Sequence, residues 1–180
     1  MIRKLAALLA LSVFAATSLR AADPAPKRKI LFFTKSSAFE HSVISWKKGQ
    51  PSWAEKTLIE LGAKNNWEFT FLKDGTNFTK DYLAQFDAVF FYTTGDLTTA
   101  GTDKNHPMTQ EGKMALLEAI KNGKGFIGTH SATDTFHTKP DDRYRSFGDR
   151  VDPYIAMIGA EFIHHDPQQI HRRTPPDVKL

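Results

Sequence analysis

Short apolar runs alternate along this chain with segments of helical periodicity. The runs at residues 30–33 and 86–92 hold at most one charged side chain each, which is typical of strands buried on both faces of a sheet. Residues 52–62 and 109–121 instead repeat apolar side chains at helical spacing. This alternation predicts a parallel sheet with helices packed on both faces.

The remaining segments extend the same order. Residues 67–72 alternate as a strand with their aromatic side chains on one face, and residues 125–128 predict a further strand. A last short helix is expected at 153–158 and a last strand at 160–164. Right-handed crossovers make such a chain an open, doubly wound α/β sheet, since a closed barrel would need eight repeats.

The two longer helices, at 52–62 and 109–121, have residues near their ends that are typical of helix caps. Ser52 can cap the first helix and Gly62 can help to end it. Gly123 lies where the second helix needs a left-handed C-terminal cap. The buried stripe expected on the second helix is formed by Met114, Leu117 and Ile120.

The first 22 residues have the order of a secretory signal peptide. Arg3 and Lys4 precede an apolar run over residues 5–16, and small residues lie near Ala22. The run is too short to span a bilayer, so we expect an exported protein, periplasmic or secreted, that is not held in a membrane after cleavage. The alternative is an anchor that stays uncleaved.

Charge and cysteine content exclude several classes of function. Three of the 24 basic residues and none of the 20 acidic residues lie in the first 22 positions, so the remainder carries 21 basic against 20 acidic residues. The basic isoelectric point therefore reflects the leader, and we expect no nucleic-acid partner. The chain has no cysteine, which excludes disulfides, thiolate metal sites and thiol nucleophiles.

Histidines follow three of the expected strands. His41 comes after the first strand, His130 after the strand at 125–128, and His165 after the last. Ligands of open parallel sheets bind at the carboxyl ends of the strands, so we expect these imidazoles at one edge. Three neutral imidazoles with an open position for water would suit a divalent metal, although their spacing is not a metal motif and the cofactor stays open.

The segment Gly128 to Ala132 has the form of a nucleophile elbow, a tight strand-to-helix turn that presents its central residue above the sheet. The central residue here is His130, which is a poor nucleophile for amide hydrolysis but a good general base, proton shuttle or metal ligand. Asp134 is close enough in sequence to orient His130, or it caps the segment that follows.

Three strings, at residues 35–41, 123–135 and 159–165, resemble signatures of the ThuA-like, trehalose-utilisation family. The resemblance extends in order over residues 29–169. It implies a flavodoxin-like α/β fold similar to class I glutamine amidotransferases, whose elbow carries cysteine where this chain has His130. Glutamine hydrolysis by the usual thiolate is therefore excluded.

The resemblance also implies one ThuA-like domain over residues 23–180. The family's domain usually continues through further strands, so we expect the C-terminal part of the sheet to be missing here. A small-molecule carbohydrate, trehalose or a related keto-sugar, is the implied ligand, and the oligomeric state stays open. The catalytic residues expected are His130 and Asp134, and the residues expected to bind substrate are Ser36, His41, Asp96 and His165. The alternative is a non-catalytic module that binds a sugar or a partner.

Overall fold

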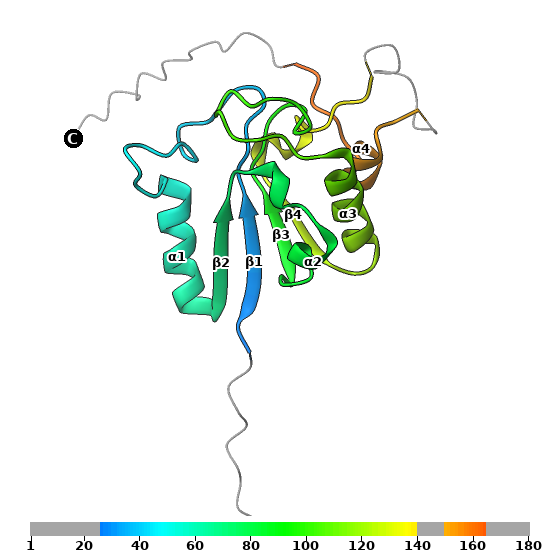
Figure 1. The fold of residues 1–180 in the computed structure, drawn as a ribbon. Helices are drawn as coiled ribbons and strands as arrows, with labels where there is room; N and C mark the ends of the chain where they lie inside the picture. Colours follow the sequence, from blue (N-terminus) through cyan, green and yellow to red (C-terminus); the bar gives the residue numbers. More distant parts are fainter. Residues whose placement is uncertain (1–25, 140–149, 165–180) are drawn as a thin grey trace, which may run out of the picture.

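A sheet of four parallel strands lies at the centre of the molecule, as Figure 1 shows. The computed structural model describes residues 26–139 and 150–164. The strands are β1 (Arg28–Phe33), β2 (Trp67–Leu72), β3 (Ala88–Phe91) and β4 (Gly125–Gly128), and their spatial order is β2-β1-β3-β4. This all-parallel sheet with flanking helices confirms the predicted flavodoxin-like α/β class.

One face of the sheet carries the main hydrophobic core. Phe33 and Phe91 lie side by side on this face with ring centroids 5.3 Å apart, and Phe78 packs 4.5 Å from Phe33. The elements that cover this face are η1 (Gly75–Asn77), α2 (Lys80–Leu83) and α3 (Gln110–Lys121). Burial of these aromatic rings is the largest favourable term available to a chain without disulfides.

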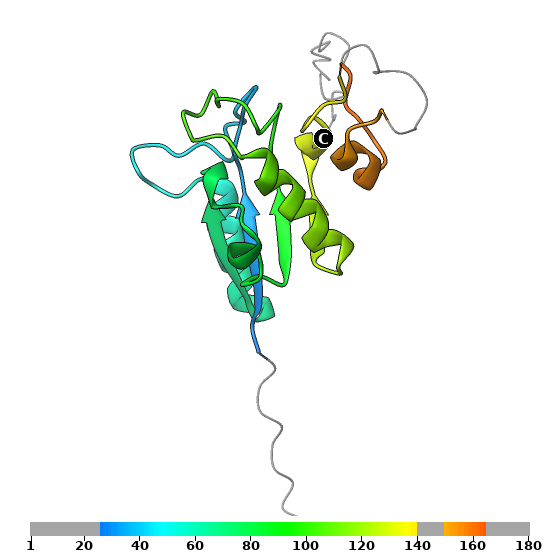
Figure 2. The ribbon, with the colours of Figure 1, turned by 45° about the vertical axis from the view of Figure 1, so that its right-hand side comes forward.

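Among the described residues, the helix on the opposite face is α1 (Trp53–Asn65), which packs on β2. Figures 1 and 2 show α1 on the side of the sheet away from α2 and α3. Phe32 is buried at the centre of this face, 6.1 Å from the ring of Phe71 on β2 and 4.9 Å from that of Phe90 on β3. Helices therefore lie on both faces, as the sequence predicts.

The predicted start of α1 is confirmed, but its predicted end is wrong. The Ser52 hydroxyl accepts a hydrogen bond from the Glu55 backbone, and the Glu55 carboxylate accepts one from the Ser52 backbone, forming a capping box. The helix continues past Gly62 to a left-handed cap at Asn66, with φ 58°. Gly62 instead lets the helix approach the sheet, since a Cβ there would lie 2.7 Å from the Trp67 carbonyl oxygen.

The predicted stripe of α3 is correct only in part. Leu116 is the apolar residue of this helix that is fully buried, whereas Leu117 and Ile120 are partly buried and Met114 is 57% exposed. The helix is rotated so that Leu116 faces the core and Met114 borders a groove toward α4 (Pro153–Ile158). The predicted left-handed cap is confirmed at Gly123, with φ 100°.

The strand predicted at residues 160–164 is wrong. After α4 this segment has no regular structure, and the Phe162 backbone donates to the Thr133 carbonyl at 2.9 Å. Glu161 accepts a hydrogen bond from the Thr138 backbone at 3.0 Å, which draws the segment toward that loop and away from β4. Within residues 26–139 and 150–164, no strand covers the outer edge of β4.

The signal peptide predicted at residues 1–22 lies outside the described part of the chain. None of the helices in the described ranges is both long and apolar enough to cross a bilayer.

Candidate functional site

A tight turn follows β4 and presents His130. This residue begins the 3₁₀ turn η2 (His130–Thr133) with φ 49°, a left-handed conformation that costs a non-glycine residue roughly 1 kcal/mol or more. Its side chain is exposed at the carboxyl edge of the sheet. The strand-to-helix corner expected from the sequence is therefore present, with His130 at its tip.

Groups outside residue 130 hold this corner in place. The Thr129 backbone donates to the Phe91 carbonyl of β3 at 3.1 Å, which continues the sheet pairing into the turn. The Tyr154 hydroxyl on α4 donates to the Ala132 carbonyl at 2.9 Å. Burial raises the pKa of Tyr154 well above its ordinary value, with a further contribution from Asp152, so this hydroxyl stays a donor at all physiological pH values.

The loop after β1 brings a second imidazole to this corner. The ring centroids of His41 and His130 are 4.5 Å apart, at an interplanar angle of 76°. Tyr92, just after β3, lies 5.5 Å from His41 and 5.4 Å from His130, and Phe39 lies 5.0 Å from His41. Two of the three predicted histidines thus meet at one edge, while His165 lies outside the described residues.

The surroundings of His41 favour its neutral form. Burial is the main cause that lowers its pKa, and the nearby positive charge of protonated His130 lowers it further, while Asp134 opposes both effects. An imidazole of this kind is uncharged at neutral pH and can accept a proton. The geometry therefore provides one exposed imidazole and one neutral imidazole in contact.

Asp134 makes a different contact from the one that we predicted. Its carboxylate lies 2.8 Å from Nε2 of His137, and Nδ1 of the same ring lies 3.2 Å from the Glu161 carboxylate. Within the described ranges, Asp134 makes no hydrogen bond to His130, because its side chain is engaged by His137 three residues later. The sequence does not indicate this pair of contacts, since Glu161 falls in the segment that was predicted to be a strand.

Ser36 and Asp96 are held by the protein itself. Ser36 is fully buried, with its backbone donating to Asp103 at 2.8 Å and its hydroxyl without a partner among the described residues. The Asp96 carboxylate accepts from the backbone and the hydroxyl of Thr98, at 3.0 and 2.7 Å, which is ordinary turn chemistry. That Ser36 and Asp96 bind a substrate stays a prediction. The burial of Ser36 and the hydrogen bonds of Asp96 to Thr98 do not favour it.

A buried lysine, Lys35, binds the loop at residues 101–105. The Lys35 ammonium is fully buried, donates to the Asn105 carbonyl at 2.8 Å and lies 3.7 Å from the Asp103 carboxylate. Burial lowers the pKa of Lys35, and Asp103 partly offsets that effect. This lysine therefore ties residues 101–105 to the end of β1 and is not available to a ligand.

The described residues do not include all three of the predicted metal ligands. In the part of the chain that the structure describes, no group of three or more His, Cys, Asp or Glu side chains is placed to hold an ion. Because His165 lies outside that part, the set of His41, His130 and His165 stays a prediction.

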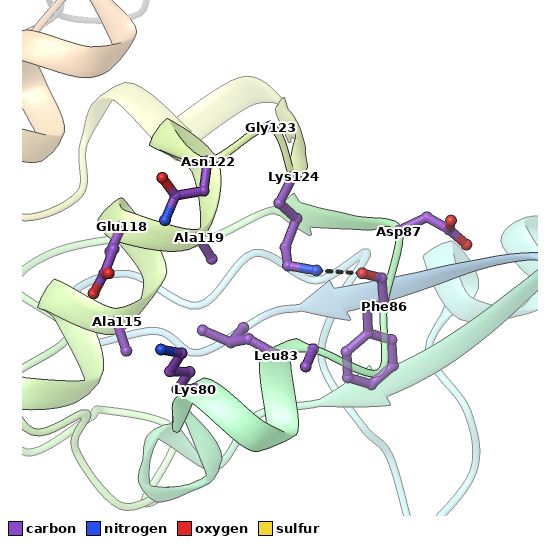
Figure 3. A pocket seen from close by; sticks show the side chains of 11 residues that line it. Lys80, Leu83, Phe86, Asp87, Ala115, Glu118, Ala119, Asn122, Gly123 and Lys124 are labelled. Atoms are coloured by element: carbon purple, nitrogen blue, oxygen red, sulfur yellow. Dashed lines mark hydrogen bonds between the residues drawn. The ribbon is translucent and has the colours of Figure 1, made fainter.

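Cavities border the sheet at both ends. One of about 310 Å³ is lined by His130, Phe126 and Met157 and lies between β4 and α4. Another, of about 400 Å³, lies between α2 and α3 at the amino ends of β3 and β4, as Figure 3 shows. There the Lys124 ammonium donates to the Phe86 carbonyl, and burial lowers its pKa. Only the first cavity adjoins the histidine pair.

A protein-family model described as ThuA, trehalose utilisation, matches residues 29–179 of the chain. No curated protein and no solved structure matches it.

Proposed function

Because the chain belongs to the ThuA family, and so broadly to trehalose utilisation, we propose that it is an exported protein that binds and converts a carbohydrate where His41 meets His130. The nearest substrates are trehalose and a keto-sugar related to it. The observation that carries the proposal is the contact between the two imidazoles at the carboxyl edge of the sheet, 4.5 Å between centroids. This is the edge at which open parallel sheets bind their ligands.

The chemistry that we propose is general acid–base catalysis. His130 is exposed to a ligand; it accepts a proton from the substrate or from water and later gives the same proton back to the product, while His41 stays neutral beside it. Hydrolysis and isomerisation of a sugar both require such a transfer. Tyr92, whose pKa is raised by burial, stays a phenol beside both rings and can donate a hydrogen bond to a sugar oxygen.

A specific observation favours the second candidate, a sugar-binding module without turnover. No carboxylate of the described residues holds the ring of His130, since Asp134 is engaged by His137. Catalytic imidazoles are usually oriented by such a partner. In this reading the edge binds a carbohydrate and His130 contributes a hydrogen bond or a stacking surface only.

The two candidates are separated by measuring binding and turnover on the same protein. Protein lacking residues 1–22 would be titrated with trehalose by calorimetry, and conversion of trehalose and its keto derivative would be followed by chromatography. We expect His130→Ala to abolish turnover and to leave binding within a few-fold of wild type. His106→Ala, at an exposed histidine paired with Asp74, is the matched control.

Binding without turnover in the wild-type protein would favour the module, and unchanged turnover in His130→Ala would remove His130 from the mechanism. The export proposal is tested separately. N-terminal sequencing of protein recovered outside the cytoplasm should begin near Asp23, and a start at Met1 would contradict cleavage of the leader.

A further inference from the structure

The cavity between β4 and α4 is joined to the histidine pair through His130. Its volume is about 310 Å³, at the lower end of the range of about 300 to 1,000 Å³ that small-molecule sites occupy. His130 lines the cavity, and the ring centroid of the same residue lies 4.5 Å from that of His41. A ligand held in this cavity therefore lies beside the residue on which the proposed proton transfer depends.

Two threonines of the cavity lining carry hydroxyls without a partner among the described residues. Thr129 and Thr133 both line the cavity and are partly buried, at the start and the end of the turn that carries His130. Neither hydroxyl makes a hydrogen bond to a residue within 26–139 or 150–164. Because a hydroxyl both donates and accepts hydrogen bonds, this pair suits a ligand that is rich in hydroxyl groups.

The backbone of β4 adds a hydrogen-bond donor to the same cavity. The Thr129 N–H donates to the Phe91 carbonyl of β3 at 3.1 Å. Successive N–H groups of a strand point in opposite directions, so the N–H of Gly128 points away from β3, toward the outer edge of β4. Gly128 lines the cavity, and none of the described residues accepts a hydrogen bond from its N–H. An oxygen of a ligand in the cavity can therefore accept this bond.

The cavity also has an apolar lining that is held in place. Phe126 of β4 and Met157 of α4 both contribute to it. The Tyr154 hydroxyl fixes α4 to η2 at 2.9 Å, and the ion pair between Lys113 and Asp152, 2.5 Å long, fixes the start of α4 to α3. Apolar and hydrogen-bonding groups in one small cavity match a pyranose ring, which has an apolar C–H face and hydroxyl groups around its rim.

We propose that this cavity binds one sugar ring of the substrate, the ring that reacts at His130. The C–H face of the ring packs on Phe126 and Met157, while the Thr133 hydroxyl and the Gly128 N–H bind its hydroxyl oxygens. The second ring of a disaccharide such as trehalose extends out of the cavity, because the volume suits a single ring. This inference rests on the proposed function, because it takes the ligand of the histidine pair to be a carbohydrate.

The methionines of the chain allow ligand binding in the cavity to be observed directly. Residues 23–180 contain three of them, of which Met157 lines the cavity, Met108 is buried in the core and Met114 is exposed on α3. Protein lacking residues 1–22 and labelled at the methionine methyl groups would be titrated with trehalose and, separately, with glucose. We expect the Met157 methyl signal to shift in a saturable way with both sugars, while the signals of Met108 and Met114 stay in place.

Two matched pairs of variants test the lining. Met157→Trp fills the cavity and should weaken trehalose binding by more than about tenfold, whereas Met114→Trp, in the groove outside the cavity, should bind like wild type. Thr133→Val removes a hydroxyl and keeps the shape, so binding should weaken by about two- to tenfold. Thr70→Val is the control, because Thr70 is partly buried on β2, at the other edge of the sheet. Thermal melting of each variant checks that it is folded.

The outcomes separate the pocket from the proposed function. If trehalose is converted in a His130-dependent way, while the Met157 signal does not move and Met157→Trp reacts normally, the pocket is wrong and the function stands. A saturable Met157 shift that Thr133→Val weakens, without turnover, supports the pocket and contradicts catalysis. If trehalose neither binds nor reacts, both proposals are overturned. A wild-type dimer that Met157→Trp converts to a monomer would show that a second copy occupies this edge, which also overturns the pocket.

Discussion

The ring centroids of His130 and His41 lie 4.5 Å apart, although the two residues follow different strands and are 89 positions apart in the chain. His130 reaches this position from a left-handed backbone conformation, φ 49°, that L-residues seldom adopt. The contact between the two imidazoles therefore depends on a strained backbone corner.

The backbone strain at His130 should appear as a difference in the free energy of unfolding between variants at this position. We expect His130→Gly to be more stable than His130→Ala by roughly 0.5 to 1 kcal/mol, because glycine adopts positive φ without a steric penalty. Urea denaturation would measure the difference. Ser131 is the control, since its φ is not positive and Gly there should be less stable than Ala. The same order at both positions would contradict strain at the corner.

The pKa of His41 should be depressed in the folded protein. Burial and His130 lower it from the ordinary value, so the midpoint of its NMR titration should lie below about 6.5. Because the unfolded chain takes up this proton first, native stability should decrease as the pH falls from about 6.5 toward the folded midpoint. In His130→Ala the midpoint should rise, since one nearby positive charge is gone, and a further fall would contradict the coupling.

Tyr154 should stabilise the turn that carries His130. Tyr154→Phe keeps the buried ring but removes the donor to the Ala132 carbonyl, so the free energy of unfolding should fall by about 1 to 2 kcal/mol. Chemical denaturation measures the loss. Tyr82→Phe is a suitable control, because Tyr82 is a partly exposed tyrosine on α2, and this variant should unfold like wild type. Equal losses in the two variants would remove the special role of Tyr154.

Asp134 and His137 should act as a pair. Asp134→Asn and His137→Ala should each lower the free energy of unfolding. The double variant should lose about 1 kcal/mol less than the sum of the two single losses, because both substitutions break the same Asp134–His137 contact. Turnover should change little in either single variant. A large loss of turnover in Asp134→Asn alone would restore the role of Asp134 in orienting His130.

The sheet was predictable from the sequence because β1 and β3 contain nearly continuous apolar runs and β2 alternates with its aromatic side chains on one face. A residue such as Phe32, buried among rings on both neighbouring strands, leaves no other placement for its segment. The segment at 160–164 also contains adjacent apolar residues, but its Glu161 contacts the Thr138 backbone and the His137 ring. That choice depends on a contact 23 residues away, which strand propensity does not contain.

The approach of His41 to His130 was predictable in outline, because strand ends of a parallel sheet share one edge. The direction of the Asp134 side chain was not predictable, since two histidines lie within four residues of it and the sequence does not indicate which of them it contacts.

Among the described residues, hydrogen bonds from the Thr129 amide and the Tyr154 phenol hold the corner at residue 130, and the His130 imidazole takes part in neither bond. The backbone of this turn does not need the side chain of residue 130 for its hydrogen bonds. Substitution of residue 130 should therefore change the side chain presented at this edge of the sheet while the backbone that carries it stays in place.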